Sequence, residues 1–122
     1  MYKSGLDPQR IESDVGLGIP DVNYKEGWVE LKHKNEWPKR GGPLRIKHFT
    51  PQQRVWLSRR WRMKGNAFLL LRVDQEFLLF DGQTANDFVG LRERSFLMSV
   101  AMAYSKQGFT YDPFIPILMR HR

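Results

Sequence analysis

Three charged residues, Asp21, Glu30 and Lys32, lie on two short segments that the sequence predicts to be neighbouring strands. In a hairpin that turns near Glu26, the numbers of paired residues sum to about 52, which places Val22 beside Glu30 and Asp21 one step away. Two carboxylates this close repel each other, and one takes up a proton unless a cation lies between them. We therefore expect a cation to be shared by Asp21 and Glu30.

The cation that suits such a site is a hard divalent ion. Mg²⁺, or Mn²⁺ in its place, prefers oxygen ligands, and the chain has no Cys that would offer a soft ligand. The backbone carbonyl of Leu31 is a candidate third oxygen. Lys32 points to the same side of its strand as Glu30, so its ammonium can hold or deprotonate an attacking water or balance charge on a phosphorus. This set would hydrolyse a phosphodiester; the alternative is a surface hairpin whose Glu30–Lys32 ion pair contributes little.

The elements that position these residues follow from caps, turns and hydrophobic spacing. In chain order we expect a helix over 7–15, strands over 21–25 and 28–34, a loop over 35–48, a helix over 50–64, strands over 67–73 and 76–80, a short helical turn, and a longer helix over 92–106. Thr50 and Gln53 predict a capping box at the start of the helix over 50–64, and Gly65 predicts where that helix ends. Thr84 and Asp87 are candidate caps of the short turn.

Two apolar stretches indicate how the elements pack. Residues 67–73 are apolar nearly throughout, as in a strand that is covered on both faces. Residues 96–104 predict a helix that is apolar almost all round, and therefore deeply buried or shared with a partner chain. We predict one domain over 1–122 of the α/β (α+β) class, with a single mixed sheet flanked by helices. The last segment, 107–122, could be a strand, an extended arm or a swapped tail.

The chain is strongly basic, with 20 Lys and Arg against 13 Asp and Glu and a formal net charge of +7. Such a surplus favours a polyanionic partner, most often a nucleic acid, although a basic surface can also be merely solvated. We expect phosphate contacts from cations in the loop and on the following helix. These candidate DNA-binding residues are Lys34, Lys39, Arg40, Arg45, Lys47, Arg54, Arg59, Arg60 and Arg62. Trp56 and Trp61 on the same helix are interpreted as core rather than as platforms for base stacking.

The wider pattern resembles the PD-(D/E)xK nuclease superfamily. Gly-Ile-Pro-Asp ending at Asp21, then Glu30-Leu31-Lys32, then Thr-Pro-Gln-Gln-Arg-Val-Trp ending at Trp56 are similar to the motifs of its VRR-NUC and Holliday-junction-resolvase-like branch. The resemblance covers roughly residues 8–82. It implies a restriction-endonuclease-like core with the order α-β-β-α-β-β-α.

The resemblance also implies roles for particular residues. Asp21 and Glu30 would bind the metal, Lys32 would be the motif lysine, and Glu12 would approach the metal directly or through water. Gln53 would face the active centre, a role compatible with a capping box. Small members of the family act as homodimers on branched DNA.

We therefore expect a Mg²⁺-dependent DNA endonuclease that is selective for branched DNA, resembles a Holliday-junction resolvase and forms a homodimer. The alternatives are a site-specific endonuclease of homing or restriction type, and a non-catalytic DNA-binding module with a nuclease fold. The chain lacks a Gly-x-x-x-x-Gly-Lys loop, so no nucleotide cofactor is expected. It also lacks an apolar run of membrane-spanning length and an apolar run typical of a signal peptide near its start, so we expect a cytoplasmic protein.

Overall fold

The computed structural model describes residues 22–24, by their backbone, and residues 27–120. The elements in chain order are β1 (Val22–Tyr24), β2 (Gly27–Lys34), α2 (Pro51–Arg62), β3 (Asn66–Val73), β4 (Glu76–Asp81), α3 (Gly82–Phe88), α4 (Arg94–Val100), β5 (Ala103–Ser105) and α5 (Phe114–Leu118). The helix expected over 7–15 lies outside the described residues. The four strands expected before residue 81 are confirmed to within one or two residues at their ends.

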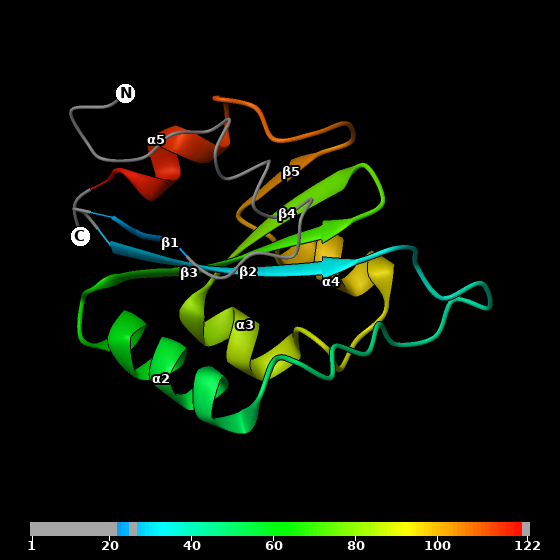
Figure 1. The fold of residues 1–122 in the computed structure, drawn as a ribbon, viewed down its shortest axis with the longest axis horizontal. Coiled ribbons are helices and arrows are strands. Elements are labelled where there is room, and N and C mark those ends of the chain that lie inside the picture. Colours follow the sequence, from blue (N-terminus) through cyan, green and yellow to red (C-terminus); the bar gives the residue numbers. More distant parts are fainter. Residues whose placement is uncertain (1–21, 25–26, 121–122) are drawn as a thin grey trace.

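The strands form one mixed sheet with the order β1-β2-β3-β4-β5. Strands β2 and β3 are parallel, and the other neighbouring pairs are antiparallel. Because two parallel strands need a crossover connection, α2 links β2 to β3 across one face of the sheet. Figure 1 shows α2 and α3 on that face and α5 on the opposite one. The predicted single mixed sheet flanked by helices is confirmed.

Each face of the sheet carries its own hydrophobic cluster. Val29, Leu31 and Phe68 face α5 and pack with its buried residues, whereas Leu69 and Leu71 face α2, α3 and α4. Strand β3 is buried along nearly its whole length, which confirms the prediction of a strand covered on both faces. The alternation on β2 places Glu30 and Lys32 on the α2 side, opposite Val29 and Leu31.

Helix α2 starts as its sequence predicts. Thr50 is the N-cap, its side chain accepts a hydrogen bond from the Gln53 amide, and the Gln53 side chain accepts from the Thr50 amide. The end differs from the prediction, because Lys64 rather than Gly65 adopts the left-handed conformation, at φ 70°. The Gly65 amide closes the turn by donating to the Arg60 carbonyl.

The long helix predicted over 92–106 is wrong. A short helix, α4, ends at Val100, and the chain then forms β5, which pairs with β4. The Met102 amide already donates to the Leu79 carbonyl, at 2.7 Å. The edge of β4 offers backbone hydrogen bonds and a buried surface, and these outweigh the helical pattern of a short apolar run.

Two further expectations need correction. Asp81, not Thr84 or Asp87, caps α3, because its carboxylate accepts hydrogen bonds from the Thr84 amide and hydroxyl. The apolar run over 96–104 lies against its own sheet, with Leu97 and Ala103 in the two clusters. That run therefore no longer argues for a partner chain. Part of the segment 107–122 forms α5, whose Phe114, Ile115 and Leu118 cover the far face of the sheet.

Among the described residues, no helix is long and apolar enough to span a membrane.

Candidate functional site

Strand β2 presents Trp28, Glu30 and Lys32 to α2, while Val29 and Leu31 face α5. The β1–β2 register is one residue shifted from the expected one, since Val22 pairs with Val29 and Tyr24 pairs with Gly27. The placement of Val22 beside Glu30 is therefore wrong. The expectation that Glu30 and Lys32 share one side of the strand is confirmed by their mutual contact.

Glu30 and Lys32 form a buried ion pair. Lys32 Nζ lies 3.1 Å from Glu30 Oε2, and the two side chains are only about 5–6% exposed. Trp28 Nε1 donates to the other oxygen, Glu30 Oε1, at 3.3 Å. This burial rejects the alternative of a loose surface pair, because removing two charges from water is costly unless the pair is well made.

Two further acceptors hold the Lys32 ammonium. It donates to the backbone carbonyl of His48 at 3.0 Å and to the side-chain oxygen of Gln53 at 3.1 Å. Two of the three N–H donors of the ammonium are thus accounted for, and the Glu30 carboxylate lies 3.1 Å away as its ionic partner. The same Gln53 oxygen accepts from the Thr50 amide, at 3.1 Å. The capping box of α2 therefore orients Gln53 toward Lys32, so the predicted capping and site roles of Gln53 coincide.

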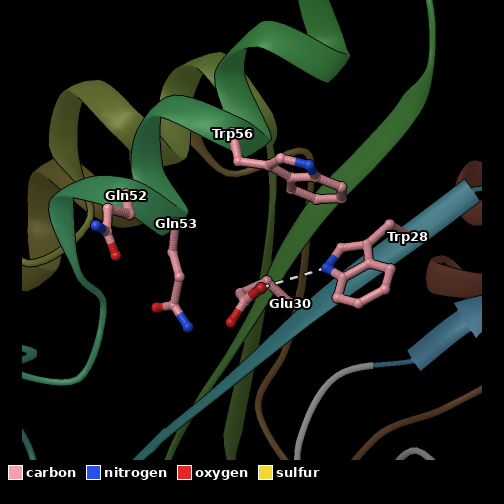
Figure 2. A pocket seen from close by; sticks show the side chains of 5 residues that line it. All are labelled: Trp28, Glu30, Gln52, Gln53 and Trp56. Atoms are coloured by element: carbon pink, nitrogen blue, oxygen red, sulfur yellow. Dashed lines mark hydrogen bonds between the residues drawn. The ribbon is translucent and has the colours of Figure 1, made fainter.

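Glu30 opens into a hollow between β2 and α2 (Figure 2). The hollow has a volume of about 280 Å³ and is lined by Trp28, Glu30, Gln52, Gln53 and Trp56. Figure 2 shows the Glu30 carboxylate between the Gln53 amide and the Trp28 indole, with Trp56 descending from α2 toward Trp28. A small molecule or a segment of a larger one can thus approach a carboxylate that is shielded from bulk water.

The remaining expected metal ligands are only partly described. Asp21 and Glu12 lie outside the described residues. Leu31 follows Glu30 on β2 and pairs with Leu70 of β3. Within the described part of the chain, no three acidic, His or Cys side chains gather as a metal-binding group. Glu30 is thus the one predicted carboxylate ligand whose surroundings the structure defines.

The loop before α2 is anchored rather than loose. Leu44 and Ile46 are buried in the core, whereas Arg45 and Lys47, which alternate with them, are exposed. The Leu44 amide donates to the Arg92 carbonyl at 3.0 Å. This alternation turns the loop cations outward next to the strand that carries Glu30. Lys39, Arg40 and Arg62 are exposed as well, whereas Lys34 and Arg60 are half-buried.

Arg54 is placed differently from the other candidate DNA-binding residues. Its guanidinium donates to the carbonyls of Ala85, Asn86 and Val89 at the end of α3. It also lies over the Phe49 ring, 4.4 Å from the centroid. Burial lowers the pKa of Arg54. These contacts give Arg54 a structural role, and we leave it out of the proposed DNA-contacting set.

The pKa values of two histidines, His48 and His33, are lowered. Burial lowers the pKa of His48, and the charges of Lys32, Lys34 and His33 lower it further. Burial likewise lowers the pKa of His33, with a smaller effect from Arg72. A lowered pKa favours the neutral imidazole, and the cation that the structure places beside Glu30 is Lys32.

Sequence reasoning missed Trp28 and Gln52 as lining residues and misplaced Trp56. Trp28 was detectable, because it lies two residues before Glu30 and so shares its face of β2. Gln52 lines the hollow beside Gln53. Trp56, predicted to be core, is 43% exposed, whereas Trp61 packs against both hydrophobic clusters as predicted.

Comparison with family models, with curated proteins and with solved structures gave no match. The inference of function therefore rests on the motif residues and on the geometry around Glu30.

Proposed function

We propose that this protein is a metal-dependent DNA endonuclease that hydrolyses phosphodiester bonds in branched DNA. The observation that carries the proposal is the contact of Glu30, Lys32 and Gln53 at a hollow of about 280 Å³. These are the residues that the resemblance to PD-(D/E)xK nucleases assigns to the active centre. The mixed sheet with a β2–α2–β3 crossover supports a restriction-endonuclease-like core.

The Glu30 environment fits one corner of a site for a hard cation. Its carboxylate is an oxygen donor of the kind that Mg²⁺ and Mn²⁺ prefer, and it borders the hollow. Asp21, the Leu31 carbonyl and Glu12 would supply the other protein ligands. When bound, such a cation would polarise a phosphate oxygen and lower the pKa of a nearby water.

Lys32 would take part by exchanging one of its contacts. Its ammonium now balances the Glu30 charge at 3.1 Å. If Glu30 turned its charge to a ligand, the Lys32 ammonium would be available to hold a water or a phosphate oxygen beside Glu30. Gln53 and the His48 carbonyl would keep the ammonium in position meanwhile, since each accepts one hydrogen bond from it.

The exposed loop cations would hold the DNA backbone beside this centre. Lys39, Arg40, Arg45 and Lys47 are exposed on the segment between β2 and α2. Phosphate contacts of this kind position DNA without reading its sequence, which suits an enzyme that recognises shape. A homodimer, proposed from the resemblance alone, would place two such centres on a four-way junction.

The second candidate is a DNA-binding module that does not cleave. It is favoured by the closed state of the ion pair, because three protein acceptors surround the Lys32 ammonium. Such an arrangement is stable as a structural element. A site-specific endonuclease, the other alternative, would share the same chemistry and differ in its substrate.

The deciding experiment uses labelled four-way-junction, flap and linear duplex DNA, each with Mg²⁺ and with EDTA. The variants are Glu30→Gln and Asp21→Asn, which remove a charge and keep the shape. Glu36→Gln is the matched control, because Glu36 is an exposed carboxylate just beyond the end of β2. Thermal unfolding followed by circular dichroism verifies that each variant is folded.

We expect paired symmetric nicks on the junction alone, lost with EDTA and in both site variants, and unchanged in Glu36→Gln. Cleavage of flaps or linear DNA instead would keep the site and change the substrate. Full activity of Glu30→Gln would refute the assignment. DNA binding without cleavage under both Mg²⁺ and Mn²⁺ would establish the binding module.

A further inference from the structure

The outward face of α2 combines exposed apolar side chains with arginines. Val55, Trp56 and Met63 are 48%, 43% and 75% exposed. Arg59 is exposed between them, and the Arg60 guanidinium lies 5.3 Å from the centroid of the Trp56 ring. Such an apolar surface on a soluble domain needs an explanation, because isolated exposed residues are common but a connected row is not.

Trp56 is the centre of this face. It lines the hollow that contains Glu30 and also two adjoining hollows along α2, one beside Arg59 and Val55 and one beside Arg60 and Met63. The Trp28 ring, at 5.2 Å and an interplanar angle of 69°, supports the indole edge-to-face. The indole is thus held in place on one side and accessible on another, as a stacking platform must be.

The charge of this face selects its partner. Residues 51–65 contain five arginines and lysines and no Asp or Glu. Of these, Arg54 is occupied by α3, while Arg59, Arg62 and Lys64 are exposed. A second copy that docked α2 against α2 around a two-fold axis would bring these cations close to their own equivalents, which is unfavourable. A polyanion with flat rings matches both the charge and the indole.

We propose that Trp56 stacks an unpaired nucleobase of single-stranded DNA, while Arg59, which lines both adjoining hollows, contacts a neighbouring phosphate. Bases inside a duplex have both faces covered, so a base that is free of its neighbours is the one that can offer a face to the indole. The inference rests on the proposed nuclease function for its biological meaning, because Trp56 and Glu30 line the same hollow. It would make the unpaired arm of a branched substrate, held at the hollow that Glu30 borders, part of substrate selection.

The test measures binding in EDTA, so that it is independent of cleavage. Fluorescence anisotropy compares a labelled short oligothymidine with a blunt duplex of the same length. The variants are Trp56→Ala, Trp56→Leu, which keeps an apolar contact but has no ring, and Trp56→Phe, which keeps a ring. Leu91→Ala is the matched control, because Leu91 is 47% exposed, close to the 43% of Trp56, and lies outside α2.

We expect Trp56→Ala to weaken oligothymidine binding by roughly 5- to 150-fold, the range for loss of one stacked base. Trp56→Leu should show a similar loss, and Trp56→Phe should retain most of the affinity. The Leu91→Ala control and all duplex affinities should change little. If Trp56→Ala fails to fold, the comparison of Leu with Phe decides in its place.

Equal binding by the Leu and Phe variants would overturn the proposal, as would parallel losses on duplex and oligothymidine. Sedimentation of the same variants tests whether a second copy of the chain binds to this face instead. If Trp56→Ala dissociates a dimer and leaves the oligothymidine affinity unchanged, the face belongs to a dimer interface. Absence of cleavage by the wild type would refute the nuclease function, and normal cleavage by Glu30→Gln would refute the role of Glu30. Either result would leave these binding measurements intact, so the two failures are distinguishable.

Discussion

The Lys32→Met substitution tests whether the ion pair is as buried as its geometry indicates. Methionine keeps most of the length of the lysine side chain and removes its charge. Glu30 would then keep the hydrogen bond from Trp28 Nε1 and lose the ammonium at 3.1 Å. The carboxylate would remain a largely buried charge, which is the situation that proteins tolerate least.

The expected magnitude follows from distance and burial. Two unit charges at 3.1 Å attract by about 5 kcal/mol at an effective dielectric constant of about 20. Loss of one partner from a buried pair typically costs about 3–5 kcal/mol. Because Glu30 borders a hollow that water can enter, we expect the lower part of this range. A loss of about 3 kcal/mol is a large share of the roughly 5–15 kcal/mol that stabilise a domain.

The double variant Glu30→Gln with Lys32→Met distinguishes the interaction between the two charges from the other contacts of the two side chains. Without the two charges, no unpaired ion is left, and we expect most of the lost stability to return. Urea unfolding followed by tryptophan fluorescence gives the free energies of unfolding for the wild type, the single variants and the double variant. Their cycle yields the coupling between the two side chains.

An exposed pair supplies the control. Arg92 Nε lies 3.2 Å from Glu93 Oε1, but both side chains are 40% exposed. Glu93→Gln should change the free energy of unfolding by less than about 1 kcal/mol. A similarly small effect of Lys32→Met would refute the reasoning, because it would show that water screens the Glu30–Lys32 pair as it does a surface pair.

Two further predictions concern the frame around the site. Glu76 accepts hydrogen bonds from Arg94, and these lower the pKa of Glu76. The ionised carboxylate therefore stabilises the fold at neutral pH, and this stabilisation is lost as the pH falls through the lowered pKa. Glu76→Gln should lower the melting temperature at pH 7, and the melting temperature of this variant should fall less on acidification than that of the wild type. Gly82→Ala should cost about 1–3 kcal/mol in urea unfolding, because its Cβ would lie 2.4 Å from the Leu57 carbonyl oxygen of α2. Gly42→Ala is the neutral control, because a Cβ at position 42 would have no atom of the described residues within 4 Å apart from those of its chain neighbours.

Local patterns were sufficient for the start of α2 and for the side on which Glu30 and Lys32 lie. A capping box involves neighbouring backbone and side-chain groups, and strand alternation depends only on a period of two residues. The positions of the first four strands along the chain also followed from hydrophobic runs and turns. The failure over 92–106 is instructive, because a short apolar run satisfies a buried helix and a buried strand equally well. The open edge of β4, which is far away in sequence, decided between them.

Tertiary structure decided how deeply the Glu30–Lys32 pair is buried. An E-x-K spacing is compatible with an exposed pair or a buried one, and here the acceptors that enclose Lys32 come from His48 and Gln53, which lie 16 and 21 residues further along the chain. The register of β1 was likewise set by pairing rather than by spacing.

The same principle separates Arg54 from the other arginines of α2 and Trp56 from Trp61. Within one helix, spacing determines which side chains share a face, but only the packing of α3 and the sheet determines which face is covered. The sequence alone thus determined the chemical types on β2 and α2 and their local geometry. Burial, ion pairing and access to the hollow depend on contacts between distant segments, which no local pattern encodes.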